Sequence, residues 1–163
     1  MNNKPSLSSV LLLWGLLALP AVSLAHGGDD GHVTEYDPVE NEFGSYGPDM
    51  KSTRVIHVDM NDGMRFSPER IKVKVGEVIR FEHTNSGKLM HEFVLGTAEY
   101  LTEHAEMMKK FPNMEHDEPY MAHVAPGKTA SMLWKFDKPG VYGFGCLIPG
   151  HFDAGMKGEV IVE

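Results

Sequence analysis

The alternation of apolar and polar residues after residue 53 predicts a series of short β-strands. In the segment 71–75, Ile71, Val73 and Val75 fall on one face and two lysines on the other, which is the period of two expected for a half-buried strand. Similar runs recur with turn residues every eight to twelve positions, for example at 65–68. The predicted strands are 53–60, 71–75, 78–84, 91–95, 129–136, 141–146 and 158–162. Such a series is typical of an antiparallel β-sandwich or barrel.

The segment 97–110 departs from this pattern and predicts a helix. Thr97 is a suitable N-cap, Glu99 lies in the first turn, and Lys109 and Lys110 lie in the last, so the charges complement the helix dipole. The residues that follow, up to 123, are rich in Pro, Met and His and predict a loop. Residues 97–123 are therefore predicted to be an insertion, a helix followed by a loop, in a domain otherwise built of β-strands.

The first 25 residues have the features of an export signal. Lys4 precedes an apolar run of about ten residues, too short to cross a bilayer of about 30 Å as a helix, and small residues at 23 and 25 suit a cleavage site. Cleavage after Ala25 would leave no membrane span and would deliver the protein to an oxidising compartment. Residues 26–52 are rich in Gly, Asp and Pro and predict an irregular or extended arm before a domain at 53–163.

The amino-acid composition excludes one class of partner and suggests one class of ligand. The chain has 163 residues with 15 Lys and Arg against 23 Asp and Glu, and this acidic balance excludes nucleic-acid binding through a basic surface. Nine His, eleven Met and a single Cys suggest a soft metal such as copper. A lone Cys in an exported protein pairs with another molecule, remains a free thiol or is protected as a metal ligand.

The spacing of four residues gives this suggestion a definite form. Cys146 ends the predicted strand 141–146, and His151 and Met156 follow it at intervals of five residues. His91 opens another predicted strand. One thiolate, two imidazoles and one thioether are the ligand set of a blue-copper centre, a trigonal His₂Cys plane with a weak axial Met. Imidazole accommodates both Cu(II) and Cu(I), and the thioether favours the reduced ion. The sequence thus predicts one copper site at the end of a strand.

Several segments around these residues resemble the cupredoxins over about two-thirds of the chain. The matching elements are the segment 89–93 around His91, the turn 125–127, the lead-in 138–142, and the run from Cys146 to Met156. The resemblance implies a Greek-key β-sandwich in which His91, Cys146, His151 and Met156 bind one copper ion. The His- and Met-bearing arm and insertion are most similar to periplasmic copper-tolerance cupredoxins of the CopI type, which implies a periplasmic location and a role in copper homeostasis.

Further His and Met residues predict accessory copper binding. Soft thioethers combined with imidazoles suit Cu(I), and a free N-terminal amine combined with imidazole suits Cu(II). The candidates are Met114, His116, Met121 and His123 in the insertion, and His26 and His32 in the arm.

Three functions can be compared on these features. Copper handling in the periplasm is favoured by the extra Met and His. A diffusing one-electron carrier is the alternative, with an acidic surface that would steer a basic redox partner such as a c-type cytochrome. Copper oxidases and nitrite reductases look like proteins in which a His next to the copper-binding Cys leads to a second metal centre. Here the neighbours of Cys146 are Gly145 and Leu147, so an enzyme of that kind is disfavoured. Oxidation of Cu(I) stays open.

Overall fold

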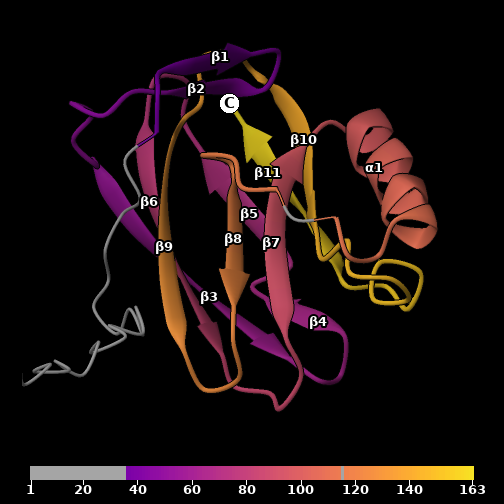
Figure 1. The fold of residues 1–163 in the computed structure, drawn as a ribbon. Helices are drawn as coiled ribbons and strands as arrows, with labels where there is room; N and C mark the ends of the chain where they lie inside the picture. Colours follow the sequence, from indigo (N-terminus) through magenta and orange to yellow (C-terminus); the bar gives the residue numbers. More distant parts are fainter. Residues whose placement is uncertain (1–35, 115) are drawn as a thin grey trace, which may run out of the picture.

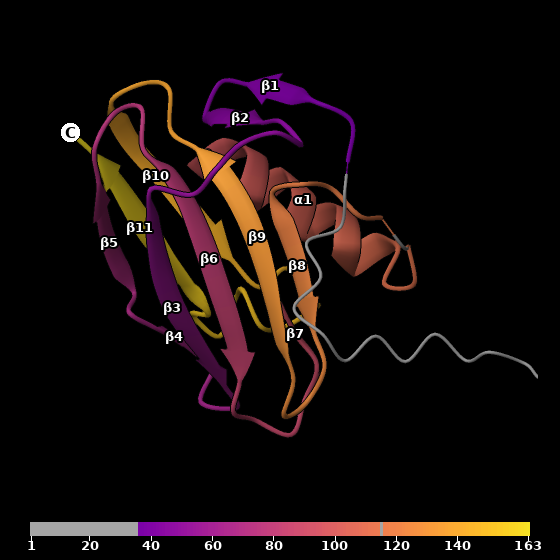
Figure 2. The ribbon, with the colours of Figure 1, turned by 90° about the vertical axis from the view of Figure 1, so that its left-hand side faces the viewer.

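The computed structural model describes residues 36–114 and 116–163. In this part of the chain two β-sheets lie face to face, and a helix covers the outer face of the second sheet (Figure 1). In Figure 2 the first sheet lies in front and the helix behind. The first sheet contains, in spatial order, β1 (Val39–Asn41), β2 (Gly44–Tyr46), β9 (Thr129–Lys135), β6 (Val78–Asn85), β3 (Arg54–Asn61) and β4 (Arg65–Ser67). The second contains β5 (Arg70–Val73), β11 (Lys157–Val162), β10 (Gly140–Gly145), β7 (His91–Gly96) and β8 (Met121–Val124).

The pairing of the strands is mixed rather than purely antiparallel. β3 pairs with β6 in parallel, and β5 pairs with β11 in parallel, while the other pairs are antiparallel. Between β3 and β6 the chain crosses to the second sheet as β5, so that β6 returns in the direction of β3, as a parallel pair requires. The predicted β-sandwich is confirmed, although two of its strand pairs are parallel. Alternation did not reveal them, because it specifies the face of a residue and not the direction of its partner strand.

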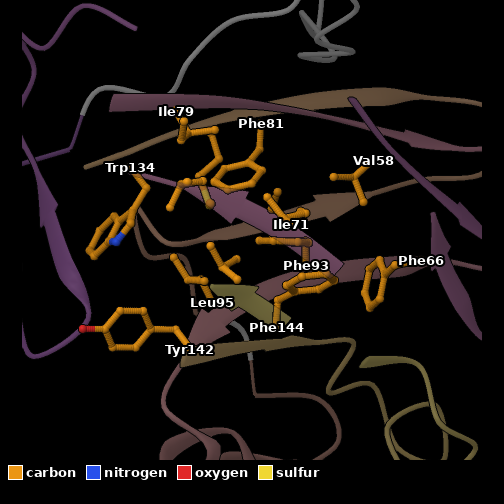
Figure 3. Close-up of a cluster of buried hydrophobic side chains, with 14 of the residues drawn as sticks. Val58, Phe66, Ile71, Ile79, Phe81, Phe93, Leu95, Trp134, Tyr142 and Phe144 are labelled. Carbon is orange, nitrogen blue, oxygen red and sulfur yellow. The ribbon is translucent and has the colours of Figure 1, made fainter. Parts of the chain in front are cut away.

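The space between the sheets is filled by large apolar side chains from both (Figure 3). Phe93 on β7 stacks on Phe144 of β10 with ring centroids 4.8 Å apart, and Phe66 meets Phe144 edge to face at 5.2 Å. Aromatic pairs of this kind add about 0.5–1.5 kcal/mol each beyond the burial of their surface. This aromatic core ends close to Cys146 and Met156, which are themselves fully buried members of the same cluster.

Three short pieces differ from the sequence prediction, two in the first sheet and one in the second. In the second sheet, residues 121–123 of the predicted loop belong to β8, which pairs with β7. Within the expected irregular arm, β1 and β2 form a hairpin at the edge of the sheet, and the Trp134 indole N–H donates to the Phe43 carbonyl oxygen between the two strands at 3.1 Å. Within the expected turn 65–68, β4 pairs with β3 and buries Phe66. Strands of three residues are too short to show periodicity, so contacts with distant parts of the chain determine whether they form.

The predicted helix is confirmed as α1 (Ala98–Lys110). The Thr97 hydroxyl accepts the main-chain N–H of Tyr100 at 3.2 Å, which satisfies one of the free donors of the first turn. The buried face of α1, including Leu101 and Met108, packs against Val94 of β7 and Leu147. The helix therefore supports the loop that follows β10. No helix in the described part of the chain has the length and apolar character needed to cross a membrane.

Candidate metal centre

The sheet topology brings the predicted ligands to one end of the second sheet. β10 runs antiparallel to both β7 and β11, so the end of β10 lies beside the beginnings of its two neighbours (Figure 1). Cys146 follows β10, His91 opens β7, and Met156 directly precedes β11. Residues that are separated by up to 65 positions in the chain thus meet at one edge of the sandwich.

Three of these residues form a compact set of metal donors. The donor atoms of His91, Cys146 and His151 all lie within 4.8 Å of one another. The Cys146 Sγ is 3.3 Å from the His151 Nδ1, and the ring centroids of His91 and His151 are 5.1 Å apart. Across residues 36–114 and 116–163, this is the one set of three His, Cys or acidic side chains with donors so close together.

The loop 147–156 returns the chain to the same point. Gly150 and Gly155 have φ angles of 90° and 94°, a region that residues with a Cβ adopt only with strain. The Cys146 N–H donates to the Met156 carbonyl oxygen and the Met156 N–H to that of His151, both at 3.0 Å. These bonds fix the main chain of Met156 beside Cys146, and its side chain is fully buried.

The orientation of His91 matches that of a metal ligand. Its Nε2 lies 3.2 Å from a carboxylate oxygen of Asp62, which also accepts the main-chain N–H groups of Lys88 and Leu89. The hydrogen bond from Lys88 is the chief cause that lowers the pKa of Asp62. The other ring nitrogen, Nδ1, is buried and has no hydrogen-bond partner among the described residues. A buried nitrogen left free while the opposite one is held by a carboxylate is the arrangement found in metal-binding histidines.

The surroundings of the thiol also suit a metal. Burial raises the pKa of Cys146 to about 12, although the main-chain N–H of Glu92, 3.4 Å from Sγ, partly offsets this effect. Burial, reinforced by repulsion from His91, lowers the pKa of His151, so this imidazole is neutral and able to bind a metal. A metal ion would displace the thiol proton and leave the thiolate shielded from water. The donor set therefore fits a soft ion such as copper.

Glu92 is a buried acidic residue that sequence analysis missed. One carboxylate oxygen accepts the N–H of Leu147 at 2.6 Å, and the other is 3.1 Å from the His123 Nε2. Glu92 and His123 are directly paired across β7 and β8, with Glu92 only 3% exposed. The one signal in the sequence is an acidic residue inside an apolar strand next to a predicted ligand. Asp62 had no such signal, because it lies in a polar turn.

The accessory candidates are placed differently from one another. His116 and His123 approach each other with ring centroids 6.4 Å apart, and His116 lies 4.6 Å from His104 of α1. Met114 is exposed beside them, whereas Met121 is buried in the apolar cluster under α1. His26 and His32 lie outside the described residues, as does the predicted signal segment.

The sequence has clear relatives. A family described as copper binding proteins, plastocyanin/azurin family, matches residues 52–163. The copper-resistant cuproprotein CopI of Rubrivivax gelatinosus is 40% identical over 160 residues, which cover 98% of this chain and 96% of that protein. The protein of the same name from Vibrio cholerae serotype O1 is 37% identical over 117 residues, covering 71% of this chain and 69% of the relative.

Solved structures share the fold at lower sequence identity. Auracyanin B superposes with a TM-score of 0.62 at 20% identity, covering 79% of this chain and 96% of that one. The dithionite-reduced auracyanin from Roseiflexus castenholzii gives a TM-score of 0.59 at 20% identity and covers 69% and 98%. These likenesses support the β-sandwich architecture.

Proposed function

Since this chain belongs to the plastocyanin/azurin family of copper-binding proteins, we propose that it is a copper-resistance protein that holds one copper ion through His91, Cys146, His151 and Met156. Its relatives at 40% and 37% identity carry the name copper-resistant cuproprotein. The observation that carries the proposal is the free, buried Nδ1 of His91 in a set of three donors within 4.8 Å. Copper bound there would supply a one-electron couple between Cu(II) and Cu(I).

The protein's own residues prepare the site for such an ion. Asp62 holds the His91 ring so that Nδ1 is directed away from the carboxylate. The N–H of Glu92 points at the Cys146 sulfur and stabilises negative charge there. The buried Met156 lies in the same cluster as Cys146 and is proposed as the weak axial ligand. Together these contacts favour a fixed ligand geometry, which limits the rearrangement needed when the charge of the ion changes.

The decisive experiment is copper loading of the purified protein with a visible absorption spectrum. One copper per chain at this site should give an intense thiolate-to-copper band, and Cys146→Ser should abolish it. His57→Ala is the matched control, because His57 is an exposed histidine of β3 in the other sheet. A full band in Cys146→Ser would refute the ligand set.

The role of Met156 is tested by the reduction potential. Met156→Leu should leave copper bound and change the potential, since an axial thioether tunes the site. Met107→Leu is the control, because Met107 is exposed on α1. An unchanged potential in Met156→Leu would show that this residue is not the axial ligand.

Export to the periplasm is part of the proposal and is supported by the order of charge, apolar run and small residues in 1–25. The mature protein should begin at His26 and be recovered from the periplasmic fraction, which mass spectrometry can establish. An intact leader in the isolated protein would contradict this. After cleavage at Ala25, His26 would be the new N-terminal residue and His32 would lie six residues further on. Both remain predicted Cu(II) ligands.

A second candidate function is electron transfer to a redox partner such as a c-type cytochrome. Leu89 and Met90, directly before His91, are 48% and 47% exposed, so the site is bordered by apolar surface of the kind used in transient contacts. Deletion of the gene separates the two functions. Loss of copper tolerance with normal respiration supports copper handling, whereas a respiratory defect with normal tolerance supports the carrier.

A further inference from the structure

A second group of histidines lies on the opposite face of β7 from the candidate copper ligands. Successive side chains of a strand point to opposite faces, so His91 and Glu92 are directed to different sides of the second sheet. On the side of Glu92 lie His104 of α1, His116 of the following loop and His123 of β8. Their ring centroids are 4.6 Å and 6.4 Å apart, values that bracket the 5.1 Å between the two imidazoles of the first site. His116 is thus the middle ring of the group, with one imidazole on each side of it.

Each of the three rings is held by one nitrogen. The anchors are the Tyr100 hydroxyl for His104 Nδ1 at 3.2 Å, the Met114 carbonyl oxygen for His116 Nδ1 at 3.2 Å, and the Glu92 carboxylate for His123 Nε2 at 3.1 Å. The second nitrogen of each ring makes no hydrogen bond with any other described residue. This division, with one nitrogen oriented by the protein and the other left free, is what a metal-binding histidine requires.

Thioethers surround the same place. An open pocket of about 540 Å³ is lined by His116 and His123 together with Met90, Met108, Met114 and Glu92. Met90 and Met114 are 47% and 38% exposed, so their thioethers are accessible to an ion that enters the pocket. Imidazole and thioether together are donors that suit Cu(I) better than Mg²⁺, Ca²⁺ or Mn²⁺.

We propose a second copper site at this pocket. It takes up Cu(I) through His116 and His123, which line the pocket, and through His104, whose ring lies beside that of His116, with Met108 or Met114 as a thioether ligand. The inference rests on the proposed function, because it takes copper as the ion that the protein handles. The donors of the first site alone lie within 4.8 Å of one another among the described residues, so binding at the second site requires a side-chain rotation. We assign this rotation to His116, which lies in the loop between α1 and β8 and whose ring is held by a single contact, with the Met114 carbonyl oxygen.

Glu92 connects the two sites. Its carboxylate contacts His123 on one side and the N–H of Leu147 on the other, while its own N–H points at the Cys146 sulfur. A cation bound by His123 would offset the negative charge of this carboxylate. The visible band or the potential of the first site should therefore shift when the second site is filled.

The test is an anaerobic titration of the metal-free protein with Cu(I) in competition with a chromogenic Cu(I) chelator. The double variant His116→Ala/His123→Ala should lose one bound ion, or bind it at least tenfold more weakly, and should keep the Cys146-dependent band after loading with Cu(II). His57→Ala should behave as the wild type. Cys146→Ser should lose the band and still bind the ion of the second site.

The outcomes separate this inference from the proposed function. A double variant that binds as many Cu(I) ions as the wild type, with the same affinity, overturns the second site. Tighter binding of Zn²⁺ than of Cu(I) at these histidines overturns the choice of copper. A wild-type protein without a Cys146-dependent band would instead refute the first site. His116→Ala alone, a change in the loop between α1 and β8, leaves the pair of Glu92 and His123 in place and should also weaken the second ion.

Discussion

The fully buried His83 makes the stability of the fold depend on pH. Its ring packs against Phe81 and Phe93, with centroids 6.0 Å and 4.4 Å away. Neither ring nitrogen has a partner within hydrogen-bonding geometry among the described residues. Burial lowers the pKa of His83 from 6.5 to about 3, and the main chain of Ala130 offsets this effect only in part. The folded protein thus keeps this imidazole neutral.

The sign and size of the effect follow from this pKa. Below pH 6.5 the unfolded chain binds a proton at His83, whereas the folded chain does not bind one until the pH approaches 3. The contribution of the neutral ring to the free energy of unfolding is therefore complete above pH 6.5 and is lost progressively as the pH falls towards 3. Each pH unit in this window costs about 1.4 kcal/mol. Between pH 7.5 and pH 5.0, His83 should therefore remove about 2 kcal/mol from the free energy of unfolding.

The assay is urea denaturation of the metal-free protein at pH 7.5 and 5.0, followed by circular dichroism. His83→Leu, a substitution of similar volume that cannot titrate, should lose about 2 kcal/mol less than the wild type between these pH values, while its change at pH 7.5 should stay below about 1.5 kcal/mol. Other titrating groups are common to both proteins and cancel in the difference. His57→Leu, at an exposed position, controls for the loss of one histidine. An equal loss of stability in the wild type and in His83→Leu would refute the neutral, buried state of this ring.

Three further changes test other parts of the structure by urea denaturation of the metal-free protein. Glu92→Ala leaves the N–H of Leu147 without its acceptor and should lower the free energy of unfolding by about 2 kcal/mol, with partial recovery in Glu92→Gln; no loss would mean that the 2.6 Å bond is not formed. In Gly158→Ala the new Cβ would collide with the Phe144 ring, and a cost of about 1–3 kcal/mol is expected; an unaltered midpoint would contradict this close approach. Thr97→Ala removes the N-cap of α1 and should lower the free energy of unfolding by about 1 kcal/mol. The second copper ion should also bind more weakly, because α1 carries His104, one of the proposed ligands. A wild-type free energy of unfolding and a wild-type copper affinity in this variant would contradict the dependence of the second site on α1.

Much of the architecture is readable from local patterns. The period-two runs predict the strands that form β3, β5, β6, β7, β9, β10 and β11, and the capping residue with its charge gradient predicts α1. These features are encoded within a few neighbouring residues, so a sequence reveals them directly. The short strands β1, β2, β4 and β8 are not readable in this way, because they are stabilised by distant contacts such as the bond from Trp134 to Phe43 and the pairing of β8 with β7.

Some residues of the candidate site are likewise predictable from the sequence, and others are not. The types and spacing of Cys146, His151 and Met156 indicate copper by themselves, since a thiolate, an imidazole and a thioether at the end of a strand have few other uses. The roles of Asp62 and Glu92 appear only in three dimensions, because they depend on which turn and which strand lie beside the ligands.

The amino-acid sequence is sufficient to specify the donor atoms, the strands that carry them and the helix that supports them, because each of these is a local property of side chains and main chain. The folded chain adds which strands run in parallel, which nitrogen of His91 is left free, and that His104 lies beside His116 and His116 beside His123. These features depend on contacts between segments far apart in the chain, whose geometry is set when the two sheets and the helix pack together.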